Sequence, residues 1–349
     1  MKIYYFANQV YQYSNAMPLY REIDGQFIVK KTKRSIQFKK YFRNGNASPD
    51  HKSLFNTPPI IKIATKDIPN LEGILISLSN VAIKHNPGEL KTIFIGHGTG
   101  DKKYGDNFHS LESYDFHFLS GPKHLAKLKD VGLNIHEDKL LKIGNLRFDD
   151  YVNNKIDKEK VLSRLGIKDR SRKNILYAPT WKWGSGTLLQ YAQPFAREIT
   201  REHNLIIRPH HHDRIHIRKL KMWARLNNIE HVYFSNPAAV IKSDTMDDFK
   251  VSDLLISDTS SILYEYLITG NPIIVIQNQF SDLHTMPDEL NIMKHVTLYD
   301  GSESILNPVN AVLKNNNSKE IYKTLLDNCF YFNDGKSVER AKEFINSVM

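Results

Sequence analysis

Short apolar runs alternate with amphipathic stretches along nearly the whole chain of 349 residues. Such runs are typical of buried strands in a parallel sheet, and the stretches between them have the periodicity of helices that cover the sheet. We expect strands at residues 3–7, 73–77, 92–95, 115–119, 175–177, 205–208, 254–257 and 273–276. The pattern therefore predicts an α/β protein.

The expected strands fall into two groups, separated by a polar segment at residues 153–172. Within this segment one short helix is expected at 158–165, and Gly166 would end it. We place a domain boundary there, with one Rossmann-like domain at residues 1–160 and a second at 161–330.

Two further helical patterns, at residues 319–327 and 337–348, follow the last strand. We expect the final segment, 331–349, to pack back toward the first domain. The simplest arrangement is two α/β domains that face each other across a cleft. Ligands of open α/β sheets bind beyond the carboxyl ends of the strands, so the loops that follow the strands are where chemistry is expected.

Composition narrows the class of partner. Hydrophobic residues make up 41% of the chain, which is normal for a globular protein, and the net charge of +10 favours phosphates, anionic lipids or nucleic acid as partners.

The single cysteine, Cys329, excludes an internal disulfide. No apolar run reaches the roughly 20 residues that span a bilayer, and residues 1–7 are too short for a secretory signal. We therefore expect a cytoplasmic protein.

The loop at residues 96–105 follows an expected strand and is rich in glycine. Its glycines would let the backbone approach a ligand closely, and His97 would be exposed at the end of the strand, where a neutral imidazole can accept a proton from a hydroxyl. Lys102 and Lys103 would attract phosphate, and Thr99 lies between the glycines. An ordinary glycine-rich turn with solvated side chains fits these residues equally well.

A second loop, at residues 206–213, reads IIRPHHHD. Arg208 at the strand end is a permanently charged fork suited to phosphate, and Pro209 turns the chain so that His210 faces the same crevice. Adjacent histidines point in different directions and have no ligand spacing, so we do not expect a metal site. His211 and His212 are expected at the surface.

The segment at residues 251–276 predicts a strand, a helix that ends at Gly270 and a further strand. The turn before the helix carries Asp258, Thr259, Ser260 and Ser261, whose hydroxyls and free N–H groups would form an anion seat at the helix start.

Ser261 and Glu265 share one face of this helix at i and i+4, so Glu265 could accept hydrogen bonds from ribose hydroxyls while Ser260 and Ser261 hold phosphates. Simple N-capping with a solvated glutamate is the alternative.

A fourth loop, at residues 176–186, adds the hydroxyl of Thr180 and a flexible Gly184–Gly186 segment that could close over a ligand. Trp181 and Trp183 could instead serve only to pack the domain interface.

Together these loops resemble, in order, the motifs of the CDP-glycerol glycerophosphotransferases of teichoic acid and capsule synthesis. The elements that carry the resemblance are residues 97–105, 144–149, 177–182, 252–261 and 334–340. The donor element at 252–261 is nearly intact, whereas Gly96, Gly100, Leu146 and Lys182 depart from the residues that are usual in the family.

The resemblance implies a GT-B type fold, with two Rossmann-like domains facing across a cleft and carboxy-terminal helices crossing back to the first domain. It implies transfer of a glycerol phosphate, or a related polyol phosphate, from a CDP-linked donor to a hydroxyl of a lipid-linked or oligosaccharide acceptor, with release of CMP and no cofactor.

By the same resemblance, His97 would be the general base and His210 a second catalytic residue. The donor pyrophosphate would be held by Arg208, His210, Ser260 and Ser261, with Thr180 and Thr259 nearby. Glu265 and Asp258 would bind the ribose and nucleotide, and Lys102, Lys103 and Thr99 would attract the acceptor. The sequence contains no Asp-x-Asp pair, the commonest carboxylate clamp for a divalent ion on such donors, so we expect chemistry that does not depend on a metal.

A second class of enzyme stays open beside this one, and a non-enzymatic class is weighed against it. A GT-B glycosyltransferase or epimerase that uses a nucleotide sugar would need the same phosphate seat and ribose carboxylate. A nucleic-acid-binding protein is not expected, because the aromatic residues do not interleave with basic ones in an RNA-binding motif. An anionic membrane surface explains the charge better, and residues 30–34 and 39–40 are candidates for contacting it unless they are simply solvated.

Overall fold

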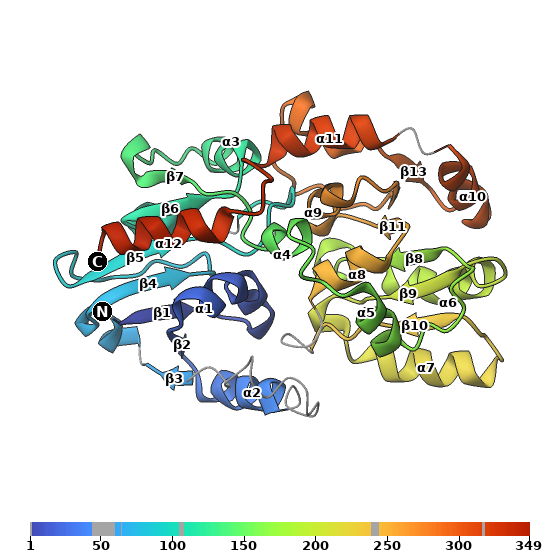
Figure 1. Ribbon diagram of the computed structural model, residues 1–349, viewed down its shortest axis with the longest axis horizontal. Coiled ribbons are helices and arrows are strands. Elements are labelled where there is room, and N and C mark those ends of the chain that lie inside the picture. The colour runs from blue at the N-terminus through green and yellow to red at the C-terminus, as the bar shows by residue number, and fades with distance from the viewer. Residues whose placement is uncertain (1, 44–59, 64, 105–107, 239–243, 316–317) are drawn as a thin grey trace.

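The computed structural model describes residues 2–43, 60–63, 65–104, 108–238, 244–315 and 318–349 (Figure 1). Within them the chain forms two parallel β-sheets that lie side by side, each covered by helices.

The first sheet has the strand order β3-β2-β1-β4-β5-β6-β7, and every described pairing in it is parallel. Its strands are β1 (Ile3–Phe6), β2 (Gln26–Val29), β3 (Ile60–Lys62), β4 (Gly73–Ser77), β5 (Leu90–Phe94), β6 (Phe116–Leu119) and β7 (Leu140–Lys142). The order reverses between β1 and β4, and at such a switch point two loops diverge and leave a crevice beyond the strand ends.

The second sheet has the order β10-β9-β8-β11-β12-β13 and is likewise parallel. Its strands are β8 (Asn174–Tyr177), β9 (Asn204–Ile207), β10 (Val232–Phe234), β11 (Leu254–Ser257), β12 (Ile273–Ile276) and β13 (Thr297–Tyr299). Its switch point lies between β8 and β11, the strands that precede the Thr180 loop and the Ser260–Ser261 turn.

Helices connect the strands and cover both faces of the sheets. The α-helices are α1 (Met17–Ile23), α2 (Thr32–Arg43), α3 (Pro122–Asp130), α4 (Phe148–Val152), α5 (Lys158–Leu165), α6 (Leu188–Ile199), α7 (His216–Leu226), α8 (Thr245–Val251), α9 (Ile262–Tyr266), α10 (Leu306–Lys314), α11 (Ser318–Cys329) and α12 (Ser337–Ser347). The 3₁₀ helices are η1 (Val10–Asn15), η3 (Thr65–Asn70), η4 (Phe108–Ser113), η5 (Glu137–Lys139), η6 (Lys182–Gly184), η7 (His211–Asp213), η8 (Leu267–Thr269), η9 (Asp288–Leu290) and η10 (Ile292–Lys294).

The linking segment contains the expected short helix, α5. The Asp157 carboxylate accepts a hydrogen bond from the N–H of Lys160 at 3.1 Å and so caps the start of the helix. Gly166 ends it in the left-handed conformation, with φ of 80°. Local signals in the sequence therefore defined both ends of this helix.

The last helix, α12, returns to the first sheet. Val338, Ala341 and Ile345 belong to the hydrophobic core beneath that sheet, and Figure 1 shows α12 lying along it. Asp149 accepts hydrogen bonds from the N–H groups of Ser337 (3.1 Å) and Val338 (2.7 Å) and so holds the start of α12. The predicted architecture is confirmed, whereas the limits at residues 160 and 330 stay predictions.

None of the helices in the described part of the chain is both long enough and apolar enough to span a membrane.

Candidate active site

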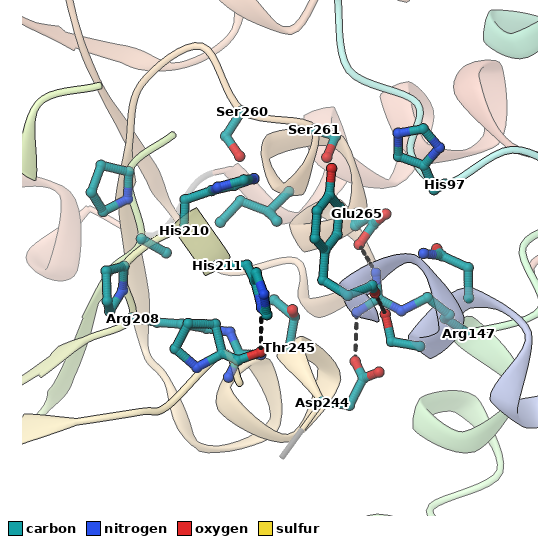
Figure 2. A pocket seen from close by; sticks show the side chains of 18 residues that line it. His97, Arg147, Arg208, His210, His211, Asp244, Thr245, Ser260, Ser261 and Glu265 are labelled. Atoms are coloured by element: carbon teal, nitrogen blue, oxygen red, sulfur yellow. Dashed lines mark hydrogen bonds and ion pairs between the residues drawn. The ribbon is translucent and has the colours of Figure 1, made fainter. Parts of the chain in front are cut away.

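A pocket lies between the two halves of the molecule, at the carboxyl ends of β5, β9 and β11 (Figure 2). The first half contributes Tyr11, Ser14, Asn15, His97 and Arg147. The second half contributes Ala178, Pro179, Arg208–His211, Pro237, Asp244, Thr245, Ser260–Ile262 and Glu265. Six residues predicted for the site therefore line one pocket: His97, Arg208, His210, Ser260, Ser261 and Glu265.

His97 is half-buried rather than exposed, because its ring is fixed against the backbone. Its Nδ1 lies 2.6 Å from the carbonyl oxygen of Leu78, and Gln12 lies beside the same nitrogen at 3.3 Å. A carbonyl oxygen can only accept, so Nδ1 carries the proton and the lone pair is on Nε2. Burial lowers the pKa of His97 to about 4, so the imidazole is neutral at pH 7.

The loop that carries His97 lies directly against the Ser260–Ser261 turn of the other half. A Cβ placed on Gly100 would lie 2.7 Å from the Cα of Ser261, and one on Gly98 would lie 3.1 Å from its Oγ. Only glycine allows this approach at position 100. His97 and Ser261 consequently lie on facing walls of the pocket (Figure 2).

Asp258 is fully buried and does not line this pocket. Its carboxylate accepts hydrogen bonds from the N–H of Thr180 at 2.7 Å and from the N–H and hydroxyl of Thr187 at 3.0 and 2.9 Å. Burial raises its pKa to about 6, against the opposing effect of these bonds. Asp258 thus fixes the loop after β8.

Three predicted residues lie outside the pocket lining: Lys102 and Thr180, which join loops of the two halves, and Thr259, which joins two loops of the second half. The ammonium of Lys102 donates to the Thr180 hydroxyl at 2.5 Å, and burial lowers the pKa of this lysine. The Thr259 hydroxyl donates to the Gly184 carbonyl at 3.2 Å. Thr99 is buried nearby, whereas Lys103 is solvent-exposed and lies 3.9 Å from Asp282.

Arg208 forms part of the pocket wall and has partners within the protein. Its guanidinium donates to the Asp248 carboxylate at 2.8 Å and to the Ser235 hydroxyl at 2.7 Å. His210 stacks on Trp181, with 5.8 Å between ring centroids. Burial, followed by the neighbouring His212, lowers the pKa of His210 to about 3.

The expectation that His211 lies at the surface is wrong. This residue is 5% exposed, and its Nδ1 lies 3.4 Å from the carbonyl oxygen of Pro237. The turn that Pro209 starts folds the chain inward, so that both His210 and His211 line the pocket.

Glu265 is buried rather than solvated, because Arg147 of the other half pairs with it. One guanidinium nitrogen lies 2.6 Å from the Glu265 carboxylate and a second lies 2.5 Å from Asp244 (Figure 2). Burial raises the pKa of Glu265, and Arg147 opposes this effect. Neither Arg147 nor Asp244 was among the predicted site residues, although Arg147 lies within the motif at 144–149.

Two facing Rossmann-like sheets with a pocket between them define a protein of the GT-B type. The chain belongs to the CDP-glycerol:poly(glycerophosphate) glycerophosphotransferase family, whose model matches residues 87–347. It is 27% identical over 247 residues to the teichoic acid glycerol-phosphate primase of Bacillus subtilis (strain 168). That match covers 68% of this chain and 58% of the relative, so it spans little more than half of the curated protein.

Among solved structures, the chain is similar to a variant of the wall teichoic acid polymerase TagF soaked with CDPG. The TM-score is 0.67 at 17% identity, over 99% of this chain and 88% of the other. A putative UDP-N-acetylglucosamine 2-epimerase from Listeria monocytogenes is also similar, with a TM-score of 0.61 at 16% identity, over 100% and 96% of the two chains. At these identities both matches show a shared fold.

Proposed function

We propose that this protein transfers glycerol phosphate, or a related polyol phosphate, from a CDP-linked donor to an acceptor hydroxyl. The donor would bind in the second half of the pocket, with its pyrophosphate at the hydroxyls of Ser260 and Ser261 and near Arg208 and His210. The family to which the chain belongs supports a CDP-glycerol donor. Glu265 would accept hydrogen bonds from the ribose while Arg147 keeps its carboxylate ionised.

The observation that carries this proposal is the fixed orientation of His97 opposite the Ser260–Ser261 turn. With Nδ1 donating to Leu78, the lone pair of Nε2 can take the proton of an acceptor hydroxyl. The hydroxyl oxygen then forms a bond to the phosphorus that bears glycerol. The bond from that phosphorus to the oxygen shared with CMP breaks, and CMP leaves with its electron pair.

The neutral state of His97 suits a general base. An imidazole that is already deprotonated at pH 7 is ready to accept a proton, and a bound anionic donor raises its pKa toward the working pH. The guanidinium of Arg208 is held by Asp248 and Ser235 before the substrate arrives, so it would stabilise charge on the phosphoryl oxygens with little reorganisation.

The identity of the acceptor and the location of the enzyme in the cell belong to the same proposal. We place the acceptor on the side of His97, in the first half of the pocket, as a lipid-linked or oligosaccharide hydroxyl, with Lys102 and Lys103 drawing its phosphates toward the loop. The enzyme would act at the inner face of the cell membrane, where a lipid-linked acceptor is presented.

The test is release of CMP from CDP-glycerol in the presence of an acceptor. Substituting His97→Asn should lower turnover by about 10²- to 10⁴-fold and leave donor affinity nearly unchanged, because the base acts only in the chemical step. Ser260→Ala with Ser261→Ala should instead weaken donor binding, measured by calorimetry. His136→Asn, at an exposed histidine immediately before η5, is the matched control and should change neither quantity.

Two results would count against the proposal. Full turnover in the His97→Asn variant would remove the base assignment. Release of UDP from UDP-sugars, with no CMP from CDP-glycerol, would assign the protein to the nucleotide-sugar enzymes that share this fold.

A further inference from the structure

The carboxylate of Asp101 lies where the two halves of the molecule meet. The loop after β5 carries both His97 and Asp101. One carboxylate oxygen of Asp101 pairs with the ammonium of Lys123 on α3, and the other accepts a hydrogen bond from the hydroxyl of Tyr264 on α9 at 2.8 Å. The loop and α3 belong to the first half, whereas α9 belongs to the second. A single carboxylate therefore joins both halves.

These contacts are shielded from water. The side chains of Lys123 and Tyr264 are fully buried, and that of Asp101 is 17% exposed. The ammonium of Lys123 also lies 3.7 Å from the centroid of the Tyr264 ring, so the cation attracts the ring as well as the carboxylate. Hydrogen bonds to charged groups are shorter and stronger than neutral ones, and low local polarity strengthens them further. The three side chains, the Asp101 clamp, therefore form a well-defined unit.

The Tyr264 hydroxyl is the hydrogen-bond donor in this clamp. Burial raises the pKa of Tyr264 well above its ordinary value, and the negative charge of Asp101 raises it further. The hydroxyl oxygen in turn accepts a hydrogen bond from the N–H of Ile292 at 3.3 Å, which fixes it within the second half. The contact with Asp101 is therefore not lost by ionisation of the tyrosine near neutral pH.

The clamp connects the loop of the proposed base to the helix of the proposed phosphate seat. Helix α9 starts directly after Ser261, and Tyr264 precedes Glu265 on it. In the first half, Asp101 directly follows Gly100, which packs against the backbone of Ser261. None of the three clamp side chains lines the pocket described above. The clamp can therefore act only through the elements that it joins.

We propose that Asp101 is a positioning residue for the transfer, because it fixes the loop of His97 relative to helix α9 and its phosphate seat. The identity of the reacting groups rests on the proposed function. The attacking oxygen must lie about 3 Å from the phosphorus and in line with the bond that breaks, and the base and the donor are held by different halves. A small shift between loop and helix would slow the chemical step without removing any group that binds the donor.

The experiment compares Tyr264→Phe with Tyr266→Phe on the same helix. Both hydroxyls are buried, and that of Tyr266 lies 3.0 Å from the Ser252 hydroxyl of its own half, so only Tyr264→Phe removes a contact between the halves. Tyr264→Phe should lower kcat for CMP release from CDP-glycerol about tenfold and change the KM for this donor by less than about twofold. Tyr266→Phe should leave kcat and this KM nearly unchanged.

Asp101→Asn tests the carboxylate itself and should lower kcat by about tenfold or more. Adding Tyr264→Phe should cause little further loss, because both changes remove the same contact. Asp115→Asn is the control: this carboxylate is 24% exposed and accepts hydrogen bonds from Thr92 of the first half, and its loss should leave kcat nearly unchanged. Equal kcat values in Tyr264→Phe and Tyr266→Phe, or additive losses in the double variant, would overturn the proposal.

Hydrogen exchange of the amides at residues 96–104 separates this proposal from the proposed function, because it needs no activity. These amides should exchange faster in Tyr264→Phe than in Tyr266→Phe, since the loop has lost its tie to α9. Equal exchange in the two variants would overturn the proposal whatever the activity. Faster exchange in Tyr264→Phe, with no CMP released by the unsubstituted chain, would show that the clamp positions the loop and would refute the transferase activity.

Discussion

Within the pocket wall, the guanidinium of Arg147 lies between the carboxylates of Glu265 and Asp244. Arg147 and Glu265 are 7% and 3% exposed at their side chains, so neither charge is solvated by bulk water. A buried charge that loses its partner costs far more than the pair gains over apolar groups of the same shape. The Arg147 side chain of the first half therefore balances the charge of two carboxylates of the second half.

We expect Arg147→Met to lower the free energy of unfolding by about 3–5 kcal/mol, because it leaves Glu265 buried without its cation. Adding Glu265→Gln should recover part of this loss, since the uncompensated charge is then removed. Urea unfolding of the single and double variants measures both effects. A double variant as unstable as the sum of the two single changes would show that the ion pair is not coupled in this way.

Several residues that line the pocket could be predicted one by one from the sequence, whereas the residues they contact could not. His97, Arg208, His210 and the two serines lie at or just after the ends of expected strands, so their place at the carboxyl ends of the two sheets follows from the sequence alone. Burial of Glu265 depends on Arg147, 118 residues away, and burial of His211 depends on the Pro237 segment. Contacts of that separation leave no local signal in the sequence.

At the scale of elements, the loop after β5 connects the halves. Its backbone forms a bridge from Lys102 to Leu283, the N–H of His284 donates to the Asp101 carbonyl at 2.6 Å, and Gly100 contacts Ser261. The position of His97 is therefore set by the second half of the molecule as well as by its own sheet.

Gly100→Ala should disturb this contact. The new methyl group would lie 2.7 and 2.9 Å from backbone atoms of Ser261, which cannot rotate away, so the loop must shift and carry His97 with it. A displacement of about 1 Å at a reacting group can cost about 10²-fold in rate, and we expect a loss of that order in kcat with a smaller change in donor affinity.

Gly88→Ala is the control for this change, since its methyl group would meet only the Asn86 side chain at an ordinary 3.6 Å. Steady-state kinetics on both variants would compare their kcat values with that of the unsubstituted chain. Unchanged kcat in Gly100→Ala would mean that the loop is not fixed by its contact with Ser261.

All eight expected strands are present, to within two residues at either end, whereas β2, β3, β7, β10 and β13 were not predicted. β7, β10 and β13 are three residues long and mostly half-exposed, so they lack the continuous apolar run that identifies a buried strand. Sheet edges of this kind are formed by pairing with a neighbour rather than by local pattern.

For the molecule as a whole, buried histidines make stability depend on pH. Burial lowers the pKa to about 3 or 4 in His97, His117, His124, His210 and His211. In the unfolded chain these histidines take up protons near pH 6.5, whereas in the folded chain they stay neutral until a much lower pH. The free energy of unfolding is therefore highest above pH 6.5 and falls as the pH drops below it. Burial raises the pKa values of Asp247 and Asp258 to about 6, so these two groups take up protons in the folded chain as the pH falls toward 6. This uptake offsets only part of the stability that the five histidines lose.

We expect the melting temperature to fall by several degrees between pH 7.5 and pH 6, measured by calorimetry at constant ionic strength. His117→Phe removes one of the five groups, within a cluster where Phe94 and Tyr114 lie 5.6 and 6.0 Å away, and should make the pH dependence shallower. An equal or higher melting temperature at pH 6 would contradict this account.

The chain passes between the halves near Asp149 and again near Ser337, and the Asp149 carboxylate binds the backbone at the second passage. The two segments of chain that connect the halves are therefore held together at this point. A protease cut between the two domains at the first passage would therefore leave the fragments associated, because the carboxy-terminal fragment still carries the helix that completes the core of the other.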